Sequence, residues 1–208
     1  AVQFNGVVDG RIENIAVEDD SGGVGVASTS GTAIVVSGGS NNVIRDNFVS
    51  DPGDSAGGHG ISIESSTGNL VVSNEISAPY SAGIKLYKAN DNNVTQNSID
   101  GAGLGSRYSN VGILIGEFTA GASDGNRILD NEINGNGFGG NFPELKDGIV
   151  VRNGTGNELD TNSVRDAADR GIIVDDDDTI VVDNAVNNVG STGIIVVASN
   201  ANLTDNTV

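Results

Sequence analysis

The chain has 208 residues and no Cys, which excludes disulfide bonds and thiolate metal sites. Its 28 acidic residues outnumber 10 basic ones, and the net charge of -18 repels phosphate backbones and anionic membrane surfaces, so we expect no nucleic-acid partner. No apolar stretch is long enough to cross a membrane, so we expect no membrane insertion. Aromatic residues make up only 4%, too few for a conventional thick core, whereas Ile, Val and Leu suffice to line a thin cylinder.

A short strand pattern recurs along the chain, with Gly or Ala followed by aliphatic residues at alternate positions. Side chains in a strand alternate between two faces, so the first and third aliphatic residues are expected to point inward. The eight copies, in chain order, begin at Ala1, Ala33, Gly60, Gly83, Gly112, Gly148, Gly171 and Gly193.

A second landmark is an Asn that follows in every copy except the first, where Ile15 takes its place. An aliphatic residue stands three positions before each Asn and another two positions after it, which predicts two more short strands per copy. Aligned Asn side chains can donate to and accept from one another, so we predict an Asn ladder that begins in the second copy. The seven Asn residues are Asn47, Asn74, Asn97, Asn131, Asn162, Asn184 and Asn206.

These patterns predict an all-β fold, a right-handed single-stranded parallel β-helix of about eight coils with three short strands each. A β-sandwich of hairpins is the alternative for short aliphatic runs, but hairpins do not require seven Asn in one phase with fixed aliphatic flanks. We expect residues 1–208 to form a single β-helix domain that is a fragment of a longer chain, because solenoid ends normally carry polar caps.

Insertions concentrate in one turn, the one between the third strand of a coil and the first strand of the next. Insertions gathered on one edge of a solenoid usually build a binding face. The scarce residue types lie in this turn or beside it: His59, Tyr80, Tyr87, Tyr108, Lys85, Arg107, Lys146, Arg152 and Arg170. Rings and cations on one edge of an acidic chain predict a groove for an anionic or hydroxyl-rich ligand.

The repeat resembles that of the pectate-lyase-like superfamily, including the carbohydrate-binding and sugar-hydrolase, NosD-type and mannuronan-epimerase-like domains. The resemblance covers the whole chain and implies an extracellular or cell-surface protein that processes or binds polysaccharide. It also implies a cleft along the sheet formed by the Gly-Ile strands. The fold hosts many activities, so the resemblance is specific for fold and weakly specific for chemistry.

A lyase or C5-epimerase acting on an anionic uronate polymer is the favoured function. Removal of the proton beside a carboxylate needs a cation, a base and an acid, which predicts catalytic roles for His59, Lys85, Tyr87 and Arg107. The residues predicted to bind substrate are Tyr80, Tyr108, Lys146, Arg152 and Glu64.

Three alternatives stay open at this point. A glycoside hydrolase would use two facing carboxylates, for which Glu64, Asp147 and Asp175 edge the same sheet. The run from Asp175 through Asp176 and Asp177 is either a set of Ca²⁺ ligands or solvated surface. The third alternative is a non-catalytic cell-surface, adhesin or surface-layer module of a halophile. The acidic, Lys-poor composition is typical of halophilic surfaces.

Overall fold

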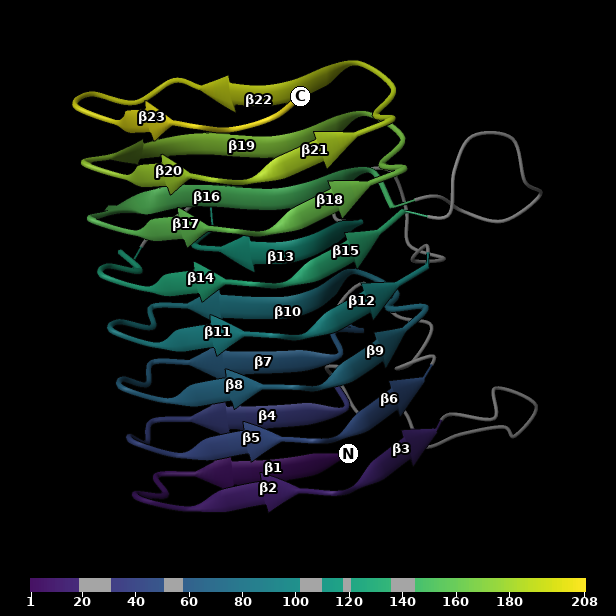
Figure 1. Cartoon of the computed structure of the whole chain (residues 1–208). Coiled ribbons are helices and arrows are strands. Elements are labelled where there is room, and N and C mark those ends of the chain that lie inside the picture. The colour runs from purple at the N-terminus through teal and green to yellow at the C-terminus, as the bar shows by residue number, and fades with distance from the viewer. Residues whose placement is uncertain (19–30, 51–57, 102–109, 118–120, 136–144) are drawn as a thin grey trace.

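The computed structural model describes residues 1–18, 31–50, 58–101, 110–117, 121–135 and 145–208. Over these residues the chain is a right-handed parallel β-helix, in which the coils stack and each contributes one strand to each of three parallel sheets, except the last, which contributes to two (Figure 1). The predicted fold class is therefore confirmed. Within the described ranges, no helix has the length and apolar character needed to cross a membrane.

Sheet 1 contains the Gly-Ile strands of all eight coils, and these strands are longer than those of the other two sheets. In stacking order its strands are β1 (Val2–Asn5), β4 (Ile34–Ser37), β7 (Ile61–Glu64), β10 (Ala82–Tyr87), β13 (Val111–Ile115), β16 (Asp147–Thr155), β19 (Arg170–Asp177) and β22 (Thr192–Val196).

Sheets 2 and 3 are built from three-residue strands on either side of the Asn corner. Sheet 2 contains β2 (Arg11–Glu13), β5 (Val43–Arg45), β8 (Leu70–Val72), β11 (Asn93–Thr95), β14 (Arg127–Leu129), β17 (Glu158–Asp160), β20 (Ile180–Val182) and β23 (Asn202–Thr204). Sheet 3 contains β3 (Ala16–Glu18), β6 (Phe48–Ser50), β9 (Glu75–Ser77), β12 (Ser98–Asp100), β15 (Glu132–Asn134), β18 (Ser163–Arg165) and β21 (Ala185–Asn187).

The core is a set of aliphatic columns that run along the helix axis. In sheet 1, Ile61 pairs with Ile84 and Ile84 with Ile113, and all three side chains are fully buried. Sheet 2 contributes a column that includes Val94, and sheet 3 one that includes Ile99. Complete burial of an Ile or Val side chain stabilises a fold by about 1.5–3 kcal/mol, so these columns hold the coils together without large aromatic residues.

The Asn ladder predicted from the sequence runs between sheets 2 and 3. The amide of Asn47 donates to Oδ1 of Asn74 at 2.9 Å, and the same contact repeats coil by coil to Asn206. In the first coil the backbone N–H of Ile15 donates to Oδ1 of Asn47, so the ladder begins in the second coil as expected. The left-handed backbone of this corner belongs to the preceding residue, for example Asp46 with φ of 53°, rather than to the Asn itself.

A second Asn ladder, which the sequence analysis did not predict, lies at the corner before sheet 2. Here Asn42 donates to Oδ1 of Asn69 at 3.0 Å, and the contact repeats through Asn92 and Asn126 to Asn157. Each member precedes a member of the first ladder by five residues. The two ladders flank the sheet 2 strands of the second to sixth coils, from β5 to β17, and fix both ends of these strands.

Candidate functional site

The outward face of sheet 1 carries the rare side chains, arranged in rows by the parallel register. Lys85 lies between Ser62 and Leu114 in the middle row, and that row continues through Val150 and Ile173. In the row at the strand ends, Tyr87 lies beside Glu64, and Arg152 beside Asp175. The face is therefore polar in the third and fourth coils and has an apolar centre beyond them.

The polar part contains what we term the Tyr87 cluster: Ser62, Glu64, Lys85, Tyr87 and Lys88. The ammonium groups of Lys85 and Lys88 lie 5.2 and 5.1 Å from the centre of the Tyr87 ring. Both distances are within the range of cation–π attraction. Beside the ring, the Ser62 hydroxyl donates to Oε1 of Glu64 at 2.8 Å. The cluster thus brings together an aromatic ring, two cations and the Glu64 carboxylate, with the Ser62 hydroxyl buried behind them.

Lys85 is also held from the neighbouring coil, because its ammonium group forms an ion pair with Glu117. Lys88, in contrast, is exposed and forms no ion pair with the residues that the structure describes. A cation already paired with a carboxylate attracts a second anion less strongly, so Lys88 is the stronger anion-binding group of the two.

His59 is buried, and its Nδ1 accepts a hydrogen bond from the backbone N–H of Ala82 at 3.2 Å. Burial, with a smaller contribution from the Lys85 charge, lowers the pKa of His59 to about 3. The imidazole is therefore neutral at ordinary pH and carries its proton on Nε2. In this geometry His59 can donate a hydrogen bond, but it has no free lone pair with which to act as a general base.

A second charged group lies further along the face, in the sixth and seventh coils, and we term it the Arg152 cluster: Asp147, Arg152, Arg170 and Asp175. The Arg170 guanidinium binds Asp147 through two hydrogen bonds of 2.8 Å, an arrangement that fixes both side chains. Burial, followed by repulsion from Arg170, lowers the pKa of Arg152. Arg152 is thus a partly desolvated cation at the edge of the apolar row.

The structure brings three of the predicted site residues together. Lys85, Tyr87 and Glu64 form the Tyr87 cluster, with His59 buried close to Lys85. Tyr80 is half-buried just before β10. Lys146 pairs with Asp169 at 3.9 Å, and Arg107 and Tyr108 lie outside the described residues.

The Asp run predicted to hold Ca²⁺ does not converge on one point. Asp175 and Asp177 are exposed, whereas Asp176 between them is buried and accepts hydrogen bonds from Gly154 and Asn157. Within the described part of the chain, no group of three or more His, Cys, Asp or Glu residues is placed to hold a metal ion. The alternation follows from the strand itself, because successive side chains in β19 point to opposite faces.

Two features of the site were missed by sequence reasoning. The Asp147–Arg170 pair was detectable, since each residue stands two positions before the first inward Ile of its strand and the two strands are consecutive. The contact of Lys85 with Glu117 had no such signal, because Glu117 lies beyond the end of β13.

Comparison with known proteins agrees with this architecture. The sequence profile of the NosD family, described as a periplasmic copper-binding protein, matches residues 7–144. A search of curated proteins gave no match. Among solved structures, a double mutant of the periplasmic alginate epimerase AlgG is similar with a TM-score of 0.64 and 14% identity, covering 85% of this chain and 48% of AlgG.

Two further solved structures share the fold. Another AlgG mutant has a TM-score of 0.58 and 14% identity over 83% of this chain and 47% of AlgG. The Dettilon tailspike protein has a TM-score of 0.60 and 15% identity over 79% of this chain and 33% of the tailspike. The chain thus spans about half of AlgG and a third of the tailspike. Because the profile match extends over more than half of its length, the chain belongs to the NosD family.

Proposed function

We propose that this protein binds an acidic polysaccharide outside the cytoplasm, on the outward face of sheet 1, with the Tyr87 cluster at the centre of the site. The observation that carries the proposal is the placement of two ammonium groups beside one aromatic ring, in a chain whose net charge is -18. A polymer bearing carboxylates would otherwise be repelled by this chain, so a local cation pair is what binding requires.

The chemistry of the cluster suits a sugar. An aromatic ring packs against the apolar face of a sugar ring, while a carboxylate such as that of Glu64 can bond its hydroxyl groups. Lys88 supplies a cation for a carboxylate. The likeness to an alginate epimerase and the periplasmic description of both AlgG and NosD support polysaccharide and a location outside the cytoplasm.

The finer proposal is a lyase or epimerase reaction on a uronate polymer. In both reactions a base removes the proton on the carbon next to the carboxylate while a cation stabilises the resulting charge. An epimerase then returns a proton to the opposite face, whereas a lyase breaks the bond to the neighbouring glycosidic oxygen, which takes up a proton. Since His59 has no free lone pair, we assign the proton transfer to the Tyr87 phenol and charge stabilisation to Lys88.

A glycoside hydrolase is less well supported by the placement of the acids. Glu64 on β7 and Asp147 on β16 are three strands apart, which corresponds to about 14 Å along the axis at one strand spacing per coil. The two carboxyl groups of a glycosidase lie roughly 5–9.5 Å apart. Asp147 is in addition bound on both oxygens by Arg170.

The copper that the family description names does not fit the donor groups of this chain. Copper in proteins is bound by thiolate, thioether or imidazole groups. The sequence has no Cys and no Met, and its one imidazole, that of His59, is buried with Nδ1 already hydrogen-bonded. We therefore expect that titration with Cu⁺ or Cu²⁺ leaves the thermal unfolding midpoint unchanged.

The proposal is tested with alginate, pectate and a neutral polysaccharide, at low and high salt. Binding is followed by calorimetry, lyase products by the absorbance of unsaturated uronide, and epimerisation by the epimer ratio from NMR. Tyr87→Ala should abolish binding, while Tyr87→Phe keeps the ring and should bind normally without turnover. His59→Gln is the matched control and should retain both binding and turnover.

The outcomes separate the proposal from its alternative. Binding of an acidic polymer without any product identifies a non-catalytic binding module and rejects the reaction. No binding of any acidic polymer rejects the proposed function as a whole and favours a structural role. Normal turnover in Tyr87→Phe would remove Tyr87 from the proton transfer while leaving the binding site in place.

A further inference from the structure

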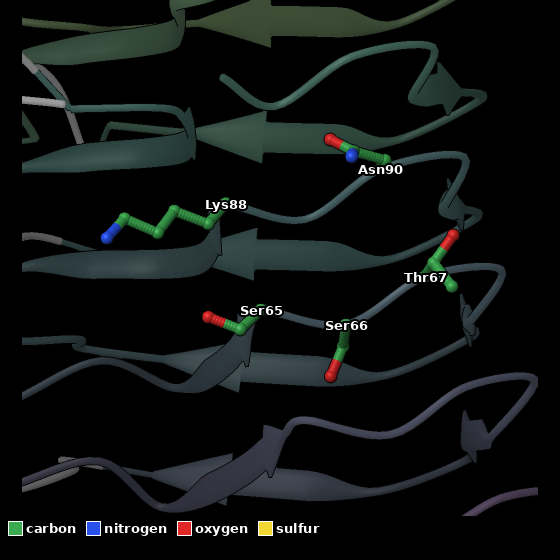
Figure 2. A pocket seen from close by; sticks show the side chains of 5 residues that line it. All are labelled: Ser65, Ser66, Thr67, Lys88 and Asn90. Carbon is green, nitrogen blue, oxygen red and sulfur yellow. The ribbon is translucent and has the colours of Figure 1, made fainter. Parts of the chain in front are cut away.

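A polar pocket of about 310 Å³ lies at the turn between sheet 1 and sheet 2, next to the Tyr87 cluster. It is formed by the third and fourth coils, where the chain leaves β7 and β10. Figure 2 shows its lining: Lys88 and Ser65 extend in the same direction from neighbouring coils, while Ser66, Thr67 and Asn90 follow along the turns. The pocket is separate from the outward face of sheet 1 but shares Lys88 with it.

Backbone geometry places the lining residues in two stacked pairs. Ser65 and Lys88 both adopt left-handed backbone angles, with φ of 49° and 52°, immediately after their strands. The Ser65 N–H donates to the carbonyl of Tyr87 at 2.9 Å, which fixes one coil on the next. Two residues further on, Thr67 and Asn90 form a parallel bridge. The pocket walls are therefore held by the stack of coils and not by loose loops.

The free hydrogen-bonding capacity of the pocket consists of donors and hydroxyl groups. The Ser66 hydroxyl is already used, since it accepts from Gly39 and donates to the carbonyl of Glu64. Asn90 accepts the backbone N–H of Asp124 at its Oδ1, so its amide NH₂ remains for a ligand. The Lys88 ammonium forms no ion pair with described residues, and Ser65 and Thr67 are exposed hydroxyls.

The charge of the pocket is opposite to that of the chain. None of its five lining residues is acidic, although the sequence has 28 Asp and Glu and only 10 Lys and Arg. Lys88 and Ser65 offer an ammonium group and a hydroxyl toward the sheet 1 side, whereas Asn90 and Thr67 offer an amide NH₂ and a hydroxyl farther along the turns (Figure 2). This set of donors suits a sugar unit that carries an anionic oxygen group at its Lys88 end.

We infer that this pocket is a subsite for a carboxylate-bearing sugar unit of the polysaccharide, one unit removed from the Tyr87 ring. The identity of the polymer rests on the proposed function, whereas the preference for an anion rests on the pocket itself. Lys88 connects the two places, because its ammonium group lies 5.1 Å from the centre of the Tyr87 ring and also lines the pocket. A chain of acidic sugars lying across Tyr87 would continue over the edge of sheet 1 into the pocket.

The test compares binding of a uronate oligosaccharide with that of a neutral oligosaccharide of equal length, by calorimetry at one fixed ionic strength. Lys88→Gln should weaken binding of the uronate oligomer about tenfold and leave the neutral one unchanged, the loss of about one charge-assisted contact. Thr67→Val keeps the shape of the side chain and removes its hydroxyl, so it should weaken binding of the uronate oligomer about threefold. Ser65→Ala should weaken this binding by a similar factor. Arg11→Gln is the matched control, an exposed cation on β2 far from the pocket, and should change neither affinity.

Each result has a defined meaning. If Lys88→Gln and Arg11→Gln weaken binding equally, the effect is general attraction and the subsite is rejected. If Lys88→Gln weakens binding but Thr67→Val and Ser65→Ala do not, Lys88 acts at the Tyr87 ring alone and the subsite is again rejected. If the unmodified protein binds no uronate oligomer, the proposed function fails. NMR titration with inorganic sulfate then tests whether the pocket binds an anion. Amide shifts confined to residues 65–67 and 88–90 support an anion site, and their absence rejects it.

Discussion

Asn157 ends the second ladder on a carboxylate, because its side-chain amide donates to Oδ2 of Asp176 at 2.5 Å and not to a further Asn. In the next coil the position that would continue the second ladder holds Thr179, whose hydroxyl also donates to Oδ2 of Asp176. Gly154 donates its backbone N–H to the other carboxylate oxygen. Asp176 thus replaces an amide as the acceptor at the end of the ladder, in a buried position.

The first prediction concerns the pH dependence of stability that Asp176 causes. Burial raises the pKa of Asp176, with a further rise from Asp124, against the lowering effect of its hydrogen bonds. A carboxyl group whose pKa is higher in the folded state contributes stability below its unfolded pKa of about 3.9, and this is lost as pH rises through the folded pKa. The cost of Asp176→Ala should therefore be larger near pH 4 than near pH 7, measured as the free energy of unfolding in urea.

Glu75→Ala is the control for this experiment, since it removes one negative charge from an exposed position on β9. Its effect reports the general relief of repulsion in an acidic chain. Equal pH profiles for the two variants would show that the buried position of Asp176 has no specific effect on stability.

The second prediction tests the first ladder at its middle and at its end. Asn97 is buried, and its side chain accepts the backbone N–H of Asn74 and donates to the Val71 carbonyl and to Oδ1 of Asn131. Asn97→Ala therefore removes hydrogen-bond partners from buried groups of both neighbouring coils. Each buried group left unpaired costs about 1–3 kcal/mol. Asn206→Ala removes an acceptor from Asn184 near the surface, where water can replace it, and should cost less. Similar unfolding free energies for the two variants would contradict a stabilising role that depends on burial.

The fold was predictable because its strongest signals are local and repeated. The inward Ile and Val columns and the Asn47 ladder follow from residue type and spacing, and both were found in the structure as predicted. The second ladder carries the same kind of signal, an Asn five residues before each first-ladder Asn from Asn42 to Asn157. It was missed because in the last two coils Thr179 and Ala201 occupy its phase, which breaks the pattern in the sequence.

The site was predictable only as a surface, not as a set of contacts. Register places Lys85 and Tyr87 on one outward face, as alternation in a strand requires. The state of His59 depends on how deeply the turn before β7 is buried and on its contact with Ala82, and neither is encoded in strand spacing. Alternation also predicts that Asp175, Asp176 and Asp177 cannot share one cation, although the sequence analysis treated the run as a unit.

The third prediction concerns the ionisation of His59. The folded pKa of about 3 lies below the ordinary 6.5, with burial as the larger cause and Lys85 as the smaller. A histidine with a lowered pKa contributes stability above its unfolded pKa, and this is lost as pH falls from 6.5 towards 3. The imidazole resonance in NMR should therefore not titrate between pH 8 and pH 5, a range above the folded pKa.

Two variants separate the causes of this shift. Lys85→Gln should raise the pKa of His59 only slightly towards its ordinary value, because burial, the larger cause of the shift, remains. His59→Gln should cost more stability at pH 7.5 than at pH 4.5, on either side of the ordinary pKa. A midpoint near 6.5 in the unmodified protein would show that the imidazole is open to water and available as a base.

The last prediction is that salt stabilises this protein. With 28 acidic and 10 basic residues, repulsion among carboxylates outweighs attraction, and salt screens it over a Debye length that falls from about 30 Å at 0.01 M to about 3 Å at 1 M. The ion pairs that salt weakens, such as Arg127 with Glu158 and Arg165 with Glu132, are exposed and contribute little. For a chain of this size each 1 kcal/mol of relief raises the unfolding midpoint by about 2–4 °C. Calorimetric scans in NaCl and KCl should show the same rise, with sucrose at equal osmolality as the control for solvent exclusion. A midpoint that stays constant or falls with salt would show that the surface carboxylates are already neutralised by local contacts, and that the acidic composition is not an adaptation to salt.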